Sequence, residues 1–262
     1  MKGELQWNDA QVRFGEYDSK PTMHENEEEE FGSSADLEYD KETFNFDFEV
    51  QNVKSTRKIS IELDGYESKS NITYCSTGLT MWKAAEFLCD HLVKQPSILD
   101  SKNILELGSG LGLCGILSEH LTDEKASIHM TDGDTDTLAH LRSNIQKNLG
   151  NCSSIECHQL LWSKENAETY LKHAAGNKKF DIILASDIIY NPCVVDPMWE
   201  TVKVLLADNG IYLFAFARRQ VEVSAKDVLE AGLSAGFEYE ECEETNPNED
   251  LFVYKFRKKT SL

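Results

Sequence analysis

The 262-residue sequence predicts an α/β domain built on a mostly parallel β-sheet. Short apolar runs alternate with segments of helical period from residue 104 to residue 235, and the run 104–107 leads directly into a glycine-rich turn. Two strand patterns, 237–241 and 251–256, then follow one another without a helix between them. Because strands joined by a short connection pair antiparallel, we expect seven strands, one antiparallel strand at the edge and helices on both faces.

Each element of this domain follows from its own pattern. The run F-D-I-I-L-A at 180–185 is the most apolar strand, so we place it at the centre of the sheet. Pro96 ends the first helix, Thr80 is a suitable N-cap for it, and 208–210 (Asp-Asn-Gly) is typical of a turn. The predicted strands are 104–107, 127–131, 154–161, 180–185, 211–217, 237–241 and 251–256. The predicted helices are 77–94, 113–121, 136–148, 166–175, 196–206 and 221–235.

Two segments precede this domain. Residues 43–64 alternate apolar and polar side chains around a polar stretch at 52–57, which predicts a β-hairpin extension. Residues 1–42 lack an apolar period, and the first 40 carry twelve acidic residues against three basic ones. We therefore expect a disordered acidic tail, either simply solvated or serving to attach a basic partner, followed by one domain over 43–262.

Charge and cysteine content exclude several classes of protein. A net charge of −20 disfavours nucleic acid as a partner. The seven cysteines are odd in number and form no C-x-x-C pair, which favours reduced thiols over a disulfide framework or a zinc site, and we predict no metal. No apolar run approaches ~18 residues and no signal peptide is evident, so we expect a cytoplasmic, also nuclear, protein that does not bind membranes.

The glycine-rich turn is the strongest candidate for a ligand site. Gly108, Gly110 and Gly112 follow a strand and precede a helix, and glycine allows sharp turning and close approach of a ligand to the backbone. Asp132 ends the next predicted strand, where a carboxylate offers two acceptors to the hydroxyls of a ribose. Asp134 and Asp136 lie close enough in sequence to compete for that role.

Several motifs in order resemble a known family. Glu106-x-Gly-x-Gly-x-Gly112 resembles the first motif of the class I, seven-strand S-adenosylmethionine-dependent methyltransferases, which have a Rossmann-like fold. Thr77-Gly-x-x-x-Trp82 resembles the T-G-x-x-x-W element of the family 16 protein methyltransferases, which include lysine methyltransferases, and Asp187-x-x-Tyr190 resembles their D-x-x-Y motif. The strand end 160–162 and the arginine pair 218–219 also fit, and the resemblance covers roughly residues 44–257.

The resemblance implies a role for each motif residue. Glu106 would approach the ammonium group of S-adenosyl-L-methionine, Asp132 would hold its ribose, and Trp162 would flank its adenine. By spacing alone Trp82 reads as a core aromatic residue, whereas the resemblance places it at the cofactor pocket. The implied cofactor-binding residues are Trp82, Glu106, Gly108, Ser109, Gly110, Gly112, Asp132, Trp162 and Ser186.

The same resemblance makes Asp187 and Tyr190 the catalytic pair. A lysine is almost wholly protonated at pH 7 and must lose its proton before it can attack a methyl group. A carboxylate can orient the lysine ammonium, and a phenol can hydrogen-bond it or form a wall of the channel. We therefore expect both residues to position the substrate, with proton transfer by Asp187 as a further role.

The function implied is an S-adenosylmethionine-dependent protein N-methyltransferase, acting on a lysine of a cytosolic protein such as an elongation factor or a chaperone. Alternatives are methylation of a protein histidine or of a small molecule, or a non-catalytic binding module that uses the acidic tail. Nucleic acid is a poor candidate also because Asn191-Pro192 follows Tyr190, unlike the Asn/Asp-Pro-Pro-aromatic motif of DNA amino-methyltransferases. We expect a monomer with a protein substrate.

Overall fold

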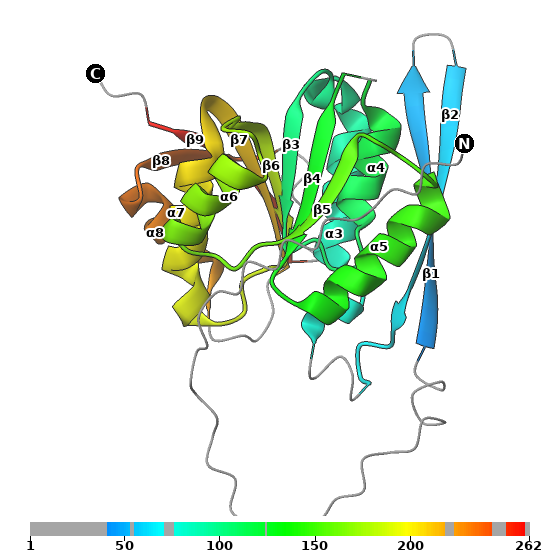
Figure 1. Ribbon diagram of the computed structural model, residues 1–262, viewed down its shortest axis with the longest axis horizontal. Helices are drawn as coiled ribbons and strands as arrows, with labels where there is room; N and C mark the ends of the chain where they lie inside the picture. Colours follow the sequence, from blue (N-terminus) through cyan, green and yellow to red (C-terminus); the bar gives the residue numbers. More distant parts are fainter. Residues whose placement is uncertain are drawn as a thin grey trace, which may run out of the picture.

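The computed structural model describes residues 41–52, 55–70, 76–123, 125–217, 223–242 and 250–259 (Figure 1). Its strands are β1 (Lys41–Asn52), β2 (Ser55–Tyr66), β3 (Asn103–Leu107), β4 (Ser127–Asp132), β5 (Ile155–Gln159), β6 (Phe180–Ser186), β7 (Leu206–Ala217), β8 (Phe237–Glu241) and β9 (Leu251–Lys258). Its α-helices are α3 (Lys83–Lys94), α4 (Leu113–Leu121), α5 (Thr135–Leu149), α6 (Lys164–His173), α7 (Val195–Leu205) and α8 (Ala225–Ser234). Short 3₁₀ turns occur at η1 (Thr77–Leu79), η2 (Pro96–Leu99) and η3 (Pro192–Val194).

The main sheet confirms the predicted fold class. Its seven strands lie in the order β5-β4-β3-β6-β7-β9-β8. Strands β3 to β7 are parallel, and β9 runs antiparallel to both β7 and β8. The antiparallel strand therefore lies one position inside the edge, between β7 and the terminal strand β8.

Two apolar cores cover the two faces of this sheet. Successive residues of a strand point to opposite faces, so Ile104 joins one core and Leu105 joins the other. Helices α3, α4 and α5 pack with the first core, and α6, α7 and α8 pack with the second (Figure 1). The middle strands β3 and β6 are mostly apolar, as expected for strands with both faces buried.

The hairpin β1–β2 is a separate two-stranded antiparallel sheet, as predicted. It lies outside α4 and α5 (Figure 1), and Phe48, Ile59, Ile61 and Leu63 join the first core. The predicted acidic tail, residues 1–42, lies outside the described residues except for its last two, which belong to β1. Within the described chain, none of the helices has both the length and the apolar character needed to cross a bilayer.

Two local predictions were wrong. The first helix begins at Lys83, and Thr80 does not cap it; the segment before it forms a 3₁₀ turn, and extended Trp82 is the N-cap. The predicted turn at 208–210 lies within β7, where the pairing with β6 jumps from Leu206 to Ile211. The polar residues there occupy a bulge that lets one long strand continue.

Candidate active site

The candidate site lies where the order of the parallel strands reverses. From β3 the chain proceeds through β4 to β5 in one direction, while β6, on the other side of β3, leads to β7. The loops after β3 and β6 therefore diverge, and the crevice between them is where open α/β sheets bind ligands. The segments that leave β3, β4 and β6 carry the glycine turn, Asp132 and Asp187 respectively.

The glycine turn needs glycine at each of its three motif positions. Gly108, Gly110 and Gly112 have φ values of +62°, +52° and +98°, which disfavour residues with a Cβ. A Cβ would also lie 2.6 Å from the Ile188 Cγ2 at Gly108 and 2.5 Å from the Leu141 Cδ1 at Gly112. Backbone conformation and packing against Ile188 and Leu141 therefore both require glycine here, and the turn remains bare backbone.

Ser109 fastens this turn to β4. Its backbone N–H donates to the Thr131 carbonyl at 2.9 Å, and its Oγ accepts from the Thr131 N–H at 3.0 Å. The Ser109 carbonyl accepts from the Gly112 N–H at 2.8 Å. Since its side chain is buried and engaged, Ser109 offers chiefly its backbone to a ligand.

Glu106 is a buried acid at the base of the turn. Only 2% of its surface is exposed, and its Oε2 accepts from the Gly115 N–H, at the start of α4, at 3.1 Å. Burial raises the pKa of Glu106 to about 8, and the Ser109 and Gly115 hydrogen bonds only partly oppose this. A cationic group bound nearby would favour the ionised carboxylate, so the position suits a ligand ammonium.

Asp132 is held against the glycine turn. Its Oδ2 accepts from the Gly110 N–H at 3.1 Å and its Oδ1 from the Asp134 N–H at 3.1 Å. Each carboxylate oxygen has a second lone pair, so acceptor capacity remains for hydroxyl groups. Burial raises the pKa of Asp132, which the backbone hydrogen bonds partly counteract.

The two competing acids have different positions. Asp134 is the N-cap of α5, because its side chain accepts from the backbone N–H groups of Asp136 and Thr137. Asp136 belongs to the first turn of the same helix. Of the three, Asp132 is the one that contacts the glycine turn.

The segment from Ser76 to Trp82 covers the turn from the other side. A Cβ on Gly110 would lie 3.2 Å from the Gly78 carbonyl, so the two backbones touch. Trp82 is partly buried, and its Nε1–H donates to the Thr77 carbonyl at 2.9 Å, which closes the segment on itself. Ser76 anchors the segment to α5 through a 2.9 Å hydroxyl contact with Thr137.

Trp162 lies beyond the carboxyl end of β5. The Leu160 N–H donates to the Asp132 carbonyl at 2.9 Å, which keeps this segment beside β4. The Trp162 Cζ2 lies 3.7 Å from where a Cβ on Gly108 would be, so the indole reaches the first glycine of the turn. Leu161 between them is 51% exposed, an unusual position for a leucine.

Ser186, Asp187 and Tyr190 follow the central strand β6. The Ser186 side chain interacts with the Cys114 thiol of α4. Asp187 is 6% exposed, has φ of +58°, and donates its N–H to the Ala215 carbonyl of β7 at 2.9 Å. Tyr190 is 49% exposed, and its hydroxyl accepts a long contact from the Thr77 Oγ1 at 3.5 Å. The pair is thus one buried acid and one exposed phenol at the same strand end.

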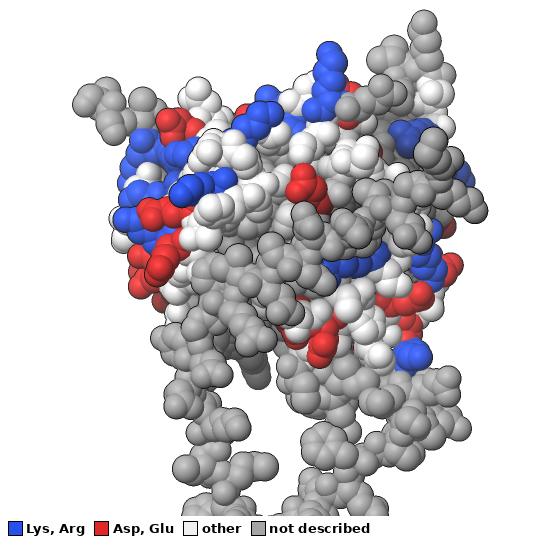
Figure 2. All heavy atoms as spheres, in the orientation of Figure 1, with Lys and Arg blue, Asp and Glu red and all other residues white. Residues whose placement is uncertain are grey.

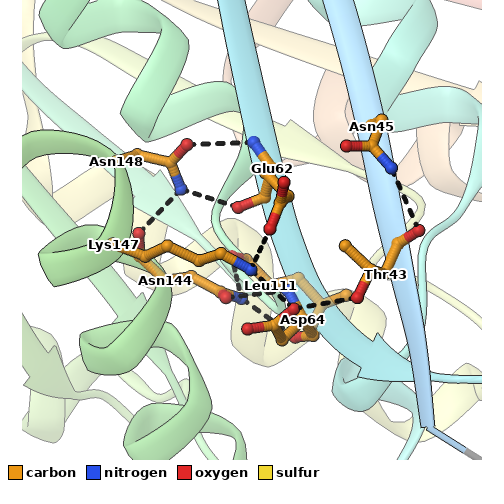
Figure 3. Close-up of polar contacts among 8 residues, drawn as sticks. All are labelled: Thr43, Asn45, Glu62, Asp64, Leu111, Asn144, Lys147 and Asn148. Atoms are coloured by element: carbon orange, nitrogen blue, oxygen red, sulfur yellow. Dashed lines mark hydrogen bonds and ion pairs between the residues drawn. The ribbon is translucent and has the colours of Figure 1, made fainter.

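A polar network that the motifs did not indicate joins this site to the hairpin (Figure 3). Asn144 of α5 accepts from the Asp64 N–H at 2.9 Å and donates to the carbonyls of Asp64 and Leu111, both at 3.1 Å. Asn148, one helical turn later, pairs with the backbone of Glu62 in the same way, at 2.9 and 2.8 Å.

These two amides occupy the free edge of β2 as a neighbouring strand would. Leu111 belongs to the glycine turn, so Asn144 connects the hairpin to the candidate site directly. Lys147 adds ion pairs to Glu62 and Asp64 from the same helix. The sequence signal was a polar residue, Asn144, at a position where the helical period places the core; its exposed fraction is 1%.

The described candidate residues lie on segments that meet at the turn 108–112: Gly78, Asp132, Trp162 and Ile188 all contact it, and they belong to the four segments that carry the candidates outside β3 and the turn itself. The arginine pair 218–219 lies outside the described residues. The face of the molecule in Figure 2 shows basic and acidic side chains interspersed. At the β8–β9 edge, for example, Glu240 pairs with Lys255 and Arg257.

Comparisons with known proteins agree with this geometry. The family model described as "Lysine methyltransferase" matches residues 63–230. A protein N-terminal and lysine N-methyltransferase, EFM7, of Candida glabrata is 29% identical over 154 residues, covering 58% of this chain and 59% of that protein. The human protein-lysine N-methyltransferase EEF2KMT is 26% identical over 200 residues, covering 72% of this chain and 59% of that one. The chain thus spans about three fifths of the length of these relatives.

Solved structures share the fold at low sequence identity. A SAM-dependent methyltransferase structure from Streptococcus mutans superposes with a TM-score of 0.54 at 11% identity, covering 80% of this chain and 55% of that one. A glycopeptide N-methyltransferase, MtfA, complexed with sinefungin, gives 0.50 at 12% identity, covering 67% and 94% respectively. These structures show that the chain has the fold of S-adenosylmethionine-dependent methyltransferases. Because the family model matches more than half of its residues, the chain belongs to the lysine methyltransferase family.

Proposed function

We propose that this chain is an S-adenosylmethionine-dependent N-methyltransferase that modifies a lysine side chain of a cytosolic protein. The single observation that carries the proposal is the convergence at one strand-order reversal of a bare glycine turn, the acid Asp132 and the pair Asp187–Tyr190. The family match and the names of the relatives support the reaction class.

The residues around the turn fit the cofactor. Gly108, Gly110 and Gly112 carry no side chain, so the methionine part would lie against bare backbone. Glu106, whose pKa burial raises to about 8, would be stabilised in its ionised form by the ammonium group. Asp132 would hold the ribose, Trp162 would flank the adenine, and Trp82 and Ser186 would complete the walls. When bound, the cofactor supplies a methyl group on a positively charged sulfur.

Asp187 and Tyr190 would act on the substrate lysine. The buried Asp187 carboxylate would attract the lysine ammonium and orient its nitrogen, and the exposed Tyr190 hydroxyl would hydrogen-bond it at the mouth of the site. The lysine proton passes to water or to Asp187 before methyl transfer. Surrounding apolar side chains such as Ile188 exclude water, which favours a reaction that disperses charge.

The partner and compartment follow from the same proposal. We infer a protein substrate rather than nucleic acid, because the chain is strongly acidic and its β8–β9 cations are paired with acids. The six cysteines that the structure describes are free thiols, as a reducing cytoplasm or nucleus permits. We propose a monomer, which light scattering of the purified protein would test.

The experiment is methyl transfer into cell extract. Purified protein and labelled S-adenosylmethionine are added to extract from cells that lack the enzyme, in parallel with the variant Asp187→Asn. We expect one labelled protein band with the wild type, little label with the variant, and methyl-lysine by mass spectrometry. Label found on histidine or in the small-molecule fraction would show that the acceptor is a histidine or a small molecule and not a lysine. An absence of label from a protein that binds the cofactor would overturn the proposal.

A further inference from the structure

A second cluster of chemically active side chains lies on the adjoining strands β4 and β5, outside the candidate active site. His129 of β4 is in register with Glu156 of β5. His158 lies two residues after Glu156, so their side chains share one face of the strand. His129 lies three residues before Asp132, which places the cluster about 10 Å along β4 from that residue of the candidate site.

The three side chains have the separations of ligands around one ion. The His158 Nε2 lies 2.9 Å from the Glu156 Oε2, and the His129 Nε2 lies 3.9 Å from the Glu156 Oε1. One donor atom from each residue lies within 4.8 Å of the others. Two ligand atoms about 2.0–2.1 Å from a tetrahedral zinc ion are roughly 3.4 Å apart, so small side-chain adjustments suffice.

A further residue fixes the orientation of the buried histidine. The Tyr170 hydroxyl of α6 lies 2.8 Å from the His129 Nδ1. The ring of Phe180 packs edge-on against the same imidazole, at 5.1 Å between centroids. The Nε2 is therefore the nitrogen presented to Glu156. Metal-binding histidines commonly have their other ring nitrogen held by such a hydrogen bond.

A hydrogen bond of 2.9 Å joins His158 to Glu156, but it does not account for the position of His129. The 3.9 Å between the His129 Nε2 and the Glu156 carboxylate is too long for a hydrogen bond, although His129 is only 6% exposed. A cation between the two groups would contact both of them. The side chains of His158 and Glu156 are 34% and 51% exposed, which leaves a path for an ion and room for water ligands.

We propose that His129, Glu156 and His158 bind a divalent transition-metal ion, with Zn²⁺ as the best-suited ion and water completing its coordination. Two imidazoles and a carboxylate are a ligand set that zinc accepts. The sequence did not predict this site because it contains no C-x-x-C pair, and the three ligands come from two separate strands. In the described sheet β5 is an edge strand, with β4 as its neighbour. Bound metal would cross-link β5 to β4 and so hold this edge in place.

The test uses purified protein without a histidine tag, stripped with chelator and titrated with Co²⁺ or Zn²⁺ alone. We expect one equivalent to bind, visible absorption typical of four-coordinate cobalt without a thiolate charge-transfer band, and a higher unfolding temperature with Zn²⁺. His158→Ala and Glu156→Gln should weaken binding more than about 100-fold, and Tyr170→Phe by roughly 10- to 100-fold. His173→Ala, which removes an exposed histidine outside the cluster, should bind as wild type does.

Fold integrity is checked separately by unfolding each variant in chelator. Glu156→Gln keeps the size of a half-exposed side chain, so it reports on binding even if the His158 variant is unstable. Binding by Glu156→Gln as tight as by wild type would overturn the proposal, as would a thiolate band or no uptake of one equivalent. Because the readouts are metal uptake and stability, they are independent of methyl transfer.

Discussion

The two halves of the candidate active site are built differently. In the proposed cofactor half, β3 leads into the glycine turn and β4 ends at Asp132, and hydrogen bonds join Gly110 to Asp132, Gly115 to Glu106, and Ser109 to Thr131. In the proposed substrate half, the buried Asp187 and the half-exposed Tyr190 follow β6. The hydroxyl of Tyr190 makes one long contact, of 3.5 Å, with Thr77.

This difference indicates a division of labour. A turn held by backbone hydrogen bonds is preorganised for one ligand, whereas an exposed phenol at the rim can meet substrates of different shape. Substitutions in one half should therefore change cofactor affinity, and those in the other half should change turnover. The predictions below test that separation.

The largest effect is expected at Asp187. Asp187→Asn should reduce methyl transfer by at least about 100-fold, since the proposed role of the carboxylate is to orient the lysine. Cofactor affinity should change by less than about twofold, because Asn tolerates the positive φ and preserves the backbone. Single-turnover rates and calorimetry measure the two quantities. A parallel loss of cofactor binding would contradict the separation.

Asp132 should show the opposite behaviour. Asp132→Ala should weaken cofactor binding by about 10- to 100-fold, the value of hydrogen bonds to a charged group, while turnover at saturating cofactor changes little. Asp136→Ala, in the first turn of α5, is the matched control and should bind the cofactor as wild type does. Unchanged affinity in Asp132→Ala would show that another group holds the ribose.

Two glycines with the same φ allow the effect of side-chain packing on stability to be measured apart from the effect of backbone strain. Gly112 and Gly236 both have φ of +98°, but a Cβ meets the Leu141 side chain at 2.5 Å only at Gly112. Gly112→Ala should therefore lower the free energy of unfolding by about 1–3 kcal/mol more than Gly236→Ala does. Urea unfolding of both variants measures this. Equal losses would mean that the turn has room for a side chain.

The asparagines of α5 test whether the hairpin supports the cofactor half. Asn144→Ala should lower the free energy of unfolding by about 1–3 kcal/mol, since it leaves buried backbone groups unpaired. It should also weaken cofactor binding, because it releases the Leu111 carbonyl of the turn. The Asn148 side chain bonds Glu62 and its own helix but not the glycine turn, so Asn148→Ala should leave cofactor affinity unchanged. Equal cofactor affinity in both variants would show that the contact between α5 and the turn does not support cofactor binding.

The last effect is a pH dependence of stability that arises from Glu106. Its pKa is about 8 in the folded protein and near 4.5 when unfolded, so the folded state binds the extra proton between these values. Stability of the cofactor-free protein should consequently fall as pH rises through that window. Glu106→Gln lacks this slope, so its stability relative to wild type should improve from pH 5 to pH 8 in urea unfolding. Parallel curves would mean that Glu106 is ionised throughout.

Local patterns predicted most of the fold and indicated the glycine turn and Asp132 of the candidate site. Each apolar strand and the glycine turn is a contiguous stretch of sequence, so a local pattern reveals it. Asp132 could be predicted beside the turn because it ends the strand that follows in the chain. Asn144 was missed because its partner Asp64 lies 80 residues away, and no local pattern encodes such a bond. The start of α3 was missed because residues 77–79 form a 3₁₀ turn, which the Trp82 indole N–H closes on the Thr77 carbonyl, and the helical period does not encode that contact.

The insertion of β9 between β7 and β8 has a consequence for synthesis. Strand β7 is apolar and lies next to β9, which follows every other described strand in the chain. Until residues 251–258 have been translated, β7 therefore presents an unpaired edge, the kind of surface that recruits foreign strands. We expect a nascent chain halted before β9 to need chaperone protection, and ribosome-bound chains cut before and after this strand to differ sharply in aggregation.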